Sequence, residues 1–134
     1  MTTDQSSTGA AVLEHANVTV RDPEESAALL SRVFGWHVRW SGPSDMGGRT
    51  VHVGTDTAYV ALYTPPDDPE AKADPDRVAG LQHLGVLVDD LDPVEAKVRA
   101  EGIEPHHFMT YDPGRRFYFY DHDGIEFEVV AYDR

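Results

Sequence analysis

The sequence repeats itself at an offset of 68 residues, and this repeat limits the chain to folds built from two similar units. The segments "LEHANVTVRD" (13–22) and "LQHLGVLVDD" (81–90) carry leucine, histidine, two valines and aspartate at matching positions. In both segments the apolar residues alternate along the chain, which is typical of a half-buried strand. A duplicated strand with a histidine at the same position predicts an internal duplication rather than two unrelated domains.

Each predicted strand is followed by a helix signal. The sequence "DPEE" from Asp22 supplies an N-cap aspartate, a proline at the first helical position and a glutamate three residues after the cap. The sequence "DPVE" from Asp92 gives the same signal in the second unit. Gly35 and Gly102 stand where the two helices should end, because glycine readily adopts the left-handed conformation of a helix C-terminus.

Three short β-like runs follow each predicted helix, so each unit is predicted to be βαβββ and the fold class to be α+β. The first unit spans residues 12–64 and the second residues 80–134, and together they are expected to form one domain. Residues 65–79 join them through an acidic, proline-rich stretch that is typical of a linker. Residues 1–11 lack apolar periodicity and are expected to form a disordered tail.

Charge and composition exclude several classes of partner. The formal net charge is −13, so phosphate backbones and anionic lipid surfaces would be repelled over most of the surface. No apolar run approaches the roughly 20 residues that a membrane-spanning helix needs. The chain has no cysteine, which fits a cytoplasmic protein. We therefore expect a cytoplasmic protein that binds neither nucleic acid nor membranes.

Strand parity predicts which side chains share a face, because alternate residues of a strand point to opposite sides. Val18 and Val86 should face the helices, which leaves the preceding histidines on the opposite, helix-free face. In the last two predicted strands, the same alternation places the glutamates and the tyrosine hydroxyls on the helix-free face as well. The helix-free face is thus predicted to collect His15, His83, Tyr118, Tyr120, Glu126 and Glu128.

Two neutral imidazoles and one carboxylate form a familiar site for divalent iron, manganese, nickel or zinc, with coordination positions left open. A single strand histidine is more often an ordinary hydrogen-bonding residue, but two at repeat-equivalent positions favour a metal. Glu126 lies nearer the final turn and is expected to be solvated, and His106 and His107 to be surface residues. The first-unit position that matches Glu128 is Ala61, so a symmetric fourth ligand is absent.

The segments "LEHANVTVRDPEESAALLSRVFGW", "LQHLGVLVDDLD" and "FYFYDHDGIEFEVV" resemble the vicinal oxygen chelate superfamily over about residues 12–133. This group includes glyoxalase I, fosfomycin-inactivating thiol transferases, extradiol dioxygenases and bleomycin-binding resistance proteins. The resemblance implies two βαβββ modules forming a curled mixed sheet around a cup, with the helices on the outer face. It also implies that His15, His83 and Glu128 match the metal-ligand positions and that the protein is a homodimer.

Departures from the family patterns reduce the number of reactions that the chain is expected to catalyse. Ala61 replaces the second glutamate that glyoxalase I uses as a ligand. Tyr118 matches the active-site tyrosine of the fosfomycin transferases, but "DPGRR" stands where those enzymes have a serine-rich loop. The extradiol dioxygenases use the same ligand trio, but they are generally longer. The bleomycin-binding branch carries no metal, and retention of all three ligands argues against it.

We therefore expect a metal-dependent enzyme in which one divalent ion (Fe, Mn, Zn or Ni) chelates two oxygens of a small substrate. The reaction would be that of a glyoxalase-like lyase or isomerase, a thiol transferase or a dioxygenase. The alternative is a metal-free protein, of the bleomycin-resistance type, that sequesters a small molecule. Four further residues are candidates for substrate contact: Tyr118 as a hydrogen-bond donor, Asn17 to orient the substrate, Arg116 as an anion clamp, and His52.

Overall fold

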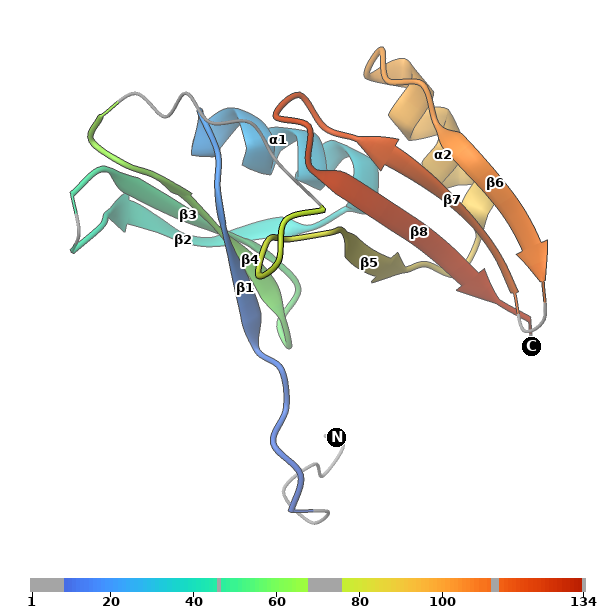
Figure 1. Cartoon of the computed structure of the whole chain (residues 1–134), viewed down its shortest axis with the longest axis horizontal. Helices are drawn as coiled ribbons and strands as arrows, with labels where there is room; N and C mark the ends of the chain where they lie inside the picture. The colour runs from blue at the N-terminus through green and yellow to red at the C-terminus, as the bar shows by residue number, and fades with distance from the viewer. Residues whose placement is uncertain (1–8, 46, 68–75, 112–113, 134) are drawn as a thin grey trace.

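The computed structural model describes residues 9–45, 47–67, 76–111 and 114–133. Two βαβββ modules follow one another along the chain (Figure 1). The first contains β1 (His15–Thr19), α1 (Pro23–Phe34), β2 (His37–Pro43), β3 (Arg49–Gly54) and β4 (Tyr59–Thr64). The second contains β5 (Leu84–Leu87), α2 (Leu91–Ala100), β6 (His106–Tyr111), β7 (Gly114–Tyr120) and β8 (Glu126–Tyr132). Much of the predicted tail and linker, residues 1–8 and 68–75, lies outside the described residues.

Each module forms its own four-stranded mixed sheet, and the two sheets have equivalent strand orders, β1-β4-β3-β2 and β5-β8-β7-β6. The first strand of each module runs parallel to the last strand, and the other neighbours are antiparallel. β1 and β5 are therefore edge strands, each paired on one side. The α+β class and the two βαβββ units are as predicted, and the sheets do not close into a barrel.

The first helix follows its predicted limits. The Asp22 side chain accepts a hydrogen bond from the Glu25 backbone N–H at 3.2 Å, and Gly35 ends the helix at φ 73°. The second helix corrects the prediction, because its N-cap is Asp90 and not Asp92. Asp90 accepts from the backbone N–H of Asp92 at 3.3 Å. Leu91 is buried, and the helix begins there, two residues before the predicted start at Pro93.

The two modules share one hydrophobic core on the helical side. α1 packs on β3 and β4, α2 packs on β7 and β8, and the helices contact each other. The Phe34 ring at the end of α1 lies 6.0 Å from the Phe119 ring and 6.1 Å from the Phe127 ring, so it packs against the second sheet. Arg32 donates two hydrogen bonds to the Glu101 carboxylate, which adds a polar link between the modules. The shared core leaves the helix-free faces of both sheets open.

The strand edges are open as well, because β1 makes no contact with β5 or β8. Large apolar side chains beside these edges are exposed, among them Leu13, Leu81 and Leu87. Unpaired edges with apolar side chains are places where a second chain can add. No helix in the described part of the chain is long and apolar enough to cross a membrane.

Candidate functional site

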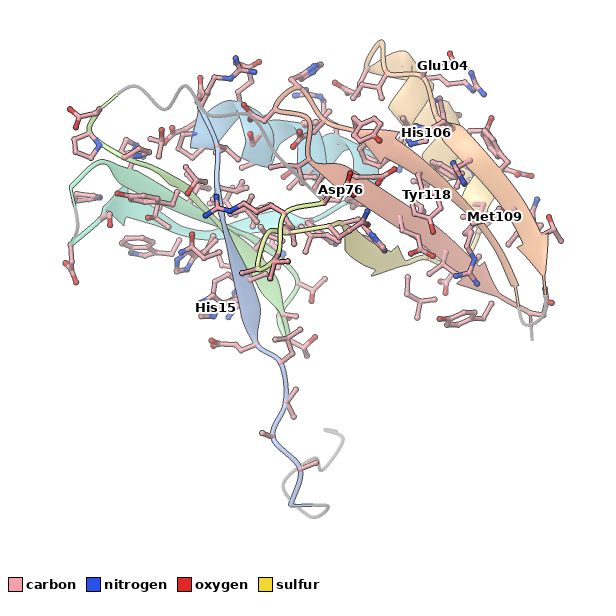
Figure 2. All side chains as sticks on the ribbon, viewed as in Figure 1. His15, Asp76, Glu104, His106, Met109 and Tyr118 are labelled. Carbon is pink, nitrogen blue, oxygen red and sulfur yellow. The ribbon has the colours of Figure 1, made fainter. Side chains whose placement is uncertain are left out.

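The helix-free faces carry the polar side chains that strand parity placed there. Val18, Val86, Phe127 and Val129 are buried on the helical side, and Phe117 and Phe119 also lie in the core. Five of the six residues named in the prediction alternate with these core residues along β1, β7 and β8, and His83, just before β5, contacts one of the five, Glu128. The face assignment is therefore confirmed. Figure 2 shows His15 on the first sheet, away from Tyr118 and His106 on the second.

His83 and Glu128 meet on the second sheet. The His83 Nε2 atom lies 3.0 Å from Glu128 Oε1, with the two side chains 34% and 13% exposed. The other ring nitrogen, Nδ1, faces the Gln82 side-chain oxygen. A neutral imidazole that donates from Nδ1 to Gln82 directs its Nε2 lone pair at the carboxylate. Two acceptors at this distance need a proton or a metal cation between them.

The separation of these two atoms fits a common metal ion. The separation of 3.0 Å is that of an ordinary hydrogen bond, and it also fits two neighbouring ligands of an octahedral ion, bound at about 2.1 Å and at a right angle. Arg116 holds the other oxygen of the carboxylate, because its Nη1 donates to Glu128 Oε2 at 2.8 Å. Both of these side chains are largely buried. Arg116 therefore fixes the orientation of Glu128 and leaves Oε1 directed at His83.

His15 belongs to the other sheet. Its ring stacks on the Tyr59 ring at 4.9 Å and 12°, and its Nδ1 lies 2.9 Å from Glu14 Oε1. Among the described residues, no group of three histidine, aspartate or glutamate side chains converges closely enough for a metal ion. The structure thus brings His83 and Glu128 together within one chain and keeps His15 apart. The buried Ala61 lies beside Asn17 in the strand register, with no donor to add.

The remaining candidates divide between the two sheets. Asn17 is exposed on β1, two residues from His15. His52 lies in a row of rings on the first sheet, 4.5 Å from the Tyr59 ring and 5.1 Å from the Trp40 ring. Partial burial, with His15 and Arg39 nearby, lowers the pKa of His52 below its ordinary value. Tyr118 lies beside His83, with 5.7 Å between their ring centroids.

The prediction for Glu126 and His106 was wrong, because they form a second histidine–carboxylate pair. His106 Nε2 lies 2.9 Å from Glu126 Oε2, and the side chains are 31% and 14% exposed. The His106 ring also stacks on Tyr120 at 4.7 Å. Strand parity identified the face of Glu126. It could not identify the partner, because a bulge after His106 shifts the register of β6.

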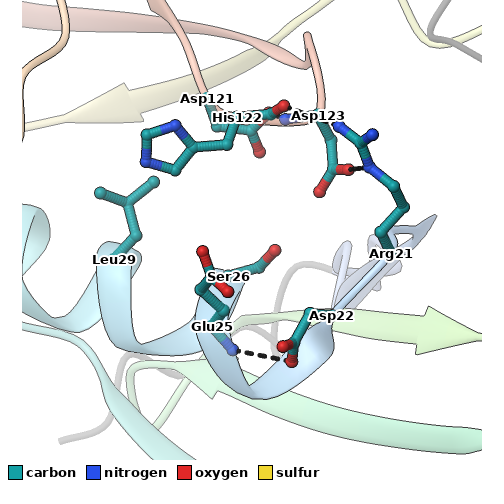
Figure 3. A pocket seen from close by; sticks show the side chains of 8 residues that line it. All are labelled: Arg21, Asp22, Glu25, Ser26, Leu29, Asp121, His122 and Asp123. Atoms are coloured by element: carbon teal, nitrogen blue, oxygen red, sulfur yellow. Dashed lines mark hydrogen bonds and ion pairs between the residues drawn. The ribbon is translucent and has the colours of Figure 1, made fainter.

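A pocket of about 180 Å³ lies on the helical side, away from these faces (Figure 3). Its lining includes the start of α1 and the turn after β7: Arg21, Asp22, Glu25, Ser26, Leu29, Asp121, His122 and Asp123. Arg21 pairs with Asp123 at 2.8 Å across the module boundary. The Oδ1 atom of Asp121 accepts from the backbone N–H groups of Asp123 and Ile125, both at 2.9 Å. These contacts fix the turn and join the modules, which is a structural role.

Comparison with known proteins identifies one family. Residues 12–129 match the family model of the glyoxalase/bleomycin resistance protein/dioxygenase superfamily, which covers most of the chain. A sequence comparison with curated proteins gives no significant match.

Solved structures share the fold at low sequence identity. A glyoxylase/bleomycin resistance protein/dioxygenase domain from Frankia sp. superposes with a TM-score of 0.80 and 21% identity, covering 92% of this chain and 98% of that chain. The fosfomycin resistance protein FosX of Listeria monocytogenes gives a TM-score of 0.72 and 19% identity over 92% and 94% of the two chains. A FosX mutant complexed with Mn(II) and 1S,2S-dihydroxypropylphosphonic acid gives 0.70 and 18% over 91% and 93%.

Proposed function

Because the chain belongs to the glyoxalase/bleomycin resistance protein/dioxygenase superfamily, we propose that it is an enzyme that binds one divalent metal ion through His15, His83 and Glu128. The observation that supports this most is the pairing of His83 Nε2 with Glu128 Oε1 at 3.0 Å, which brings two of the three ligands together at a separation that fits neighbouring positions on one octahedral ion. The bound Mn(II) of the FosX complex supports a divalent first-row metal as the cofactor.

The third ligand, His15, is supplied by a second copy of the chain. Within one chain the two modules are held together on their helical side, and β1 does not reach β5 or β8. β1 and β5 are open edge strands with exposed leucines in or just before them (Leu13, Leu81 and Leu87), which favours pairing between chains. In a two-fold dimer the first sheet of one chain would face the second sheet of its partner, and two equivalent sites would form.

The bound ion would act as a Lewis acid on two oxygens of a small substrate. Other residues of the chain would orient the metal ligands and the substrate. Arg116 orients the Glu128 carboxylate, and the Tyr118 ring lies edge-on to the His83 ring, so we assign to its hydroxyl a hydrogen bond to a substrate oxygen. Asn17 is positioned on the same strand face as His15 to contact the substrate from the other sheet.

Metal binding by single-ligand variants tests this function. We expect the full-length protein, purified without chelator or affinity tag, to contain close to one ion per chain by elemental analysis. His83→Ala, His15→Ala and Glu128→Gln should each weaken the binding of added Mn(II) by more than about a hundredfold, because each removes a direct ligand. His106→Ala is the matched control, since it breaks the other histidine–carboxylate pair of the same sheet and should leave affinity nearly unchanged.

One observation favours a second candidate, a metal-free protein that binds a small molecule. Arg116 already provides a positive partner for Glu128, so the carboxylate is satisfied without an ion. If the protein holds no metal after loading and all three ligand variants bind Mn(II) as weakly as the parent, the metal-dependent function is wrong. The metal-free candidate then remains.

A further inference from the structure

We infer that His106, paired with Glu126, is the proton-transfer residue of the proposed metal site, and that the substrate is a small carbonyl compound with a C–H group next to the carbonyl. The inference rests on the proposed function for its placement, because the pair lies on the same open face as His83 and Glu128. It adds a catalytic residue and a substrate class, which the metal ligands alone do not define.

The first observation is that the two histidines of this face hold their protons differently. The Nδ1 atom of His83 faces the Gln82 side-chain oxygen, which leaves the Nε2 lone pair for a metal. His106 Nε2 lies 2.9 Å from Glu126 Oε2, and among the described residues its Nδ1 atom has no hydrogen-bond partner. When Nε2–H donates to the carboxylate, Nδ1 of the neutral ring keeps its lone pair. His83 is therefore arranged as a ligand and His106 as a base.

The second observation is that the two carboxylates differ in the same way. Arg116 donates to Glu128 Oε2 at 2.8 Å, and both side chains are largely buried, so Glu128 is held in place and cannot move out to take a proton itself. Glu126 makes no ion pair with a lysine or arginine in the described part of the chain. Its negative charge faces His106 and compensates the positive charge that forms when the ring accepts a proton. The base of this site is therefore His106 rather than Glu128.

The third observation is a bulge that turns His106 toward the open face. His107 has a positive φ of 58°, and the register of β6 on β7 shifts between His106 and Met109. Consecutive strand residues normally point to opposite faces, yet both rings contact Tyr118, at 6.3 and 5.7 Å between centroids. A histidine with positive φ is unfavourable, and bulges are frequent beside active sites, where they redirect a side chain.

The pair lies close enough to act on a substrate held at the proposed metal. Glu126 and Glu128 are alternate residues of β8, roughly 7 Å apart along the strand at about 3.3 Å per residue. The Tyr118 ring lies between the histidines, with its centroid 5.7 Å from His83 and 6.3 Å from His106. Figure 2 shows Tyr118 and His106 on neighbouring strands of the second sheet. A small molecule with one end at the metal can thus present its next carbon to Nδ1.

The chemical step is a proton transfer without a redox change. The Nδ1 lone pair of His106 takes the proton, and the C–H electron pair becomes the C=C bond of an enolate. The negative charge develops on the carbonyl oxygen, which the divalent ion would stabilise. Return of a proton from Nδ1 to the same carbon regenerates the carbonyl compound and the neutral ring. In heavy water the proton on Nδ1 exchanges with solvent, so the carbon gains deuterium.

Deuterium uptake by pyruvate tests this step in the full-length, Mn(II)-loaded protein. Pyruvate offers two oxygens for chelation and a methyl group next to its carbonyl, and mass spectrometry measures the deuterium that it gains. We expect the parent to accelerate uptake over free Mn(II). His106→Gln should slow uptake by about a hundredfold or more, the usual contribution of a general base. Glu126→Gln should slow it by at least about tenfold, because it removes the charge that faces the protonated ring.

The matched control is His107→Asn. It removes the neighbouring imidazole of the same bulge, and asparagine tolerates a positive φ, so the bulge is kept. Mn(II) affinity and deuterium uptake should both stay as in the parent.

A second readout needs no metal. In the metal-free protein with isotope-labelled histidine, nitrogen NMR at a pH where imidazoles are neutral should show the His106 proton on Nε2 and a bare Nδ1. The His106 signals are assigned by their loss in His106→Gln. A proton on Nδ1 would leave no base at that atom and would overturn the inference.

Titration of the same variants with Mn(II) separates this inference from the proposed function. Unchanged Mn(II) affinity in His106→Gln, with uptake lost, supports both and shows that the variant is folded. If Mn(II) binds but the parent is no faster than free Mn(II), or His106→Gln is as fast as the parent, the inference is wrong and the metal function stands. If the parent binds no Mn(II), the proposed function fails. The inference then survives only if the protein still accelerates uptake and His106→Gln abolishes it.

Discussion

At the scale of single residues, Asp121 shows how a half-buried carboxylate can serve the fold rather than a site. It lies at the turn between β7 and β8, and one of its oxygens accepts two backbone hydrogen bonds. Burial raises its pKa above the ordinary value, against the opposing effect of those two bonds. The folded protein therefore holds a proton on Asp121 at a pH where the unfolded chain has released it.

Replacing Asp121 separates its charge from its hydrogen bonds. Because the pKa is raised in the folded state, this group's contribution to stability falls as pH rises through and above about 4. Asp121→Asn keeps the accepting oxygen and removes the buried charge, so at pH 7 the free energy of unfolding should be at least that of the parent. Asp121→Ala loses both bonds and should cost about 1–3 kcal/mol. Urea denaturation at pH 4 and pH 7 measures the free energy of unfolding of both variants. An equal decrease for the two variants at pH 7 would contradict this account.

Strand parity predicted the face of every proposed ligand, because side-chain alternation depends only on sequence and sheet pairing. It did not predict the partners of those side chains. His106 reaches Glu126 because His107 has a positive φ of 58° and the register of β6 shifts beside it. No apolar periodicity marks such a bulge. The contact of the Trp40 indole with Gly42, where a Cβ atom would lie 2.8 Å from the ring, was not predicted either, although a glycine inside a predicted strand can indicate a close contact.

At the scale of the elements, the start of α2 depends on packing more than on capping signals. The sequence pattern, an aspartate followed by proline and by a glutamate three residues later, indicates Asp92 and not Asp90 as the N-cap. The helix begins at Leu91 because that side chain is buried in the core. Pro93 then lies in the first turn, where its missing N–H leaves no intrahelical bond unmade. The sequence motif was therefore sufficient to predict the helix, and tertiary burial selected its first residue.

Two alanine variants test this assignment. Asp90→Ala should reduce the free energy of unfolding by about 0.5–2 kcal/mol, because it removes the side-chain bond to the Asp92 backbone N–H. Asp92→Ala should cost less, since that carboxylate contributes only its favourable position near the helix N-terminus and a long, solvent-exposed ion pair with Arg115. Urea denaturation at neutral pH compares the two. A larger decrease in the free energy of unfolding for Asp92→Ala would show that Asp92 is the N-cap, as predicted from the sequence.

At the scale of the whole molecule, the modules are joined by their helices and should unfold together. Phe34 connects α1 to the rings of the second sheet. Phe34→Ala should lower the free energy of unfolding by roughly 3 kcal/mol while the protein still unfolds in one transition. Circular dichroism and tryptophan fluorescence should report the same midpoint. Two separate transitions in the parent would show that the modules are independent.

The central claim is that one metal site is built from two chains, and subunit mixing tests it most directly. His15→Ala and His83→Ala homodimers each lack a ligand in both sites. In a mixed dimer, His15 of the His83→Ala chain would meet His83 and Glu128 of the His15→Ala chain, so one of the two sites would be complete. Unfolding and refolding the two variants together should thus restore tight Mn(II) binding at about one ion per four chains, as expected for random pairing. No recovery in the mixture, with a parent that binds one ion per chain, would contradict the shared site.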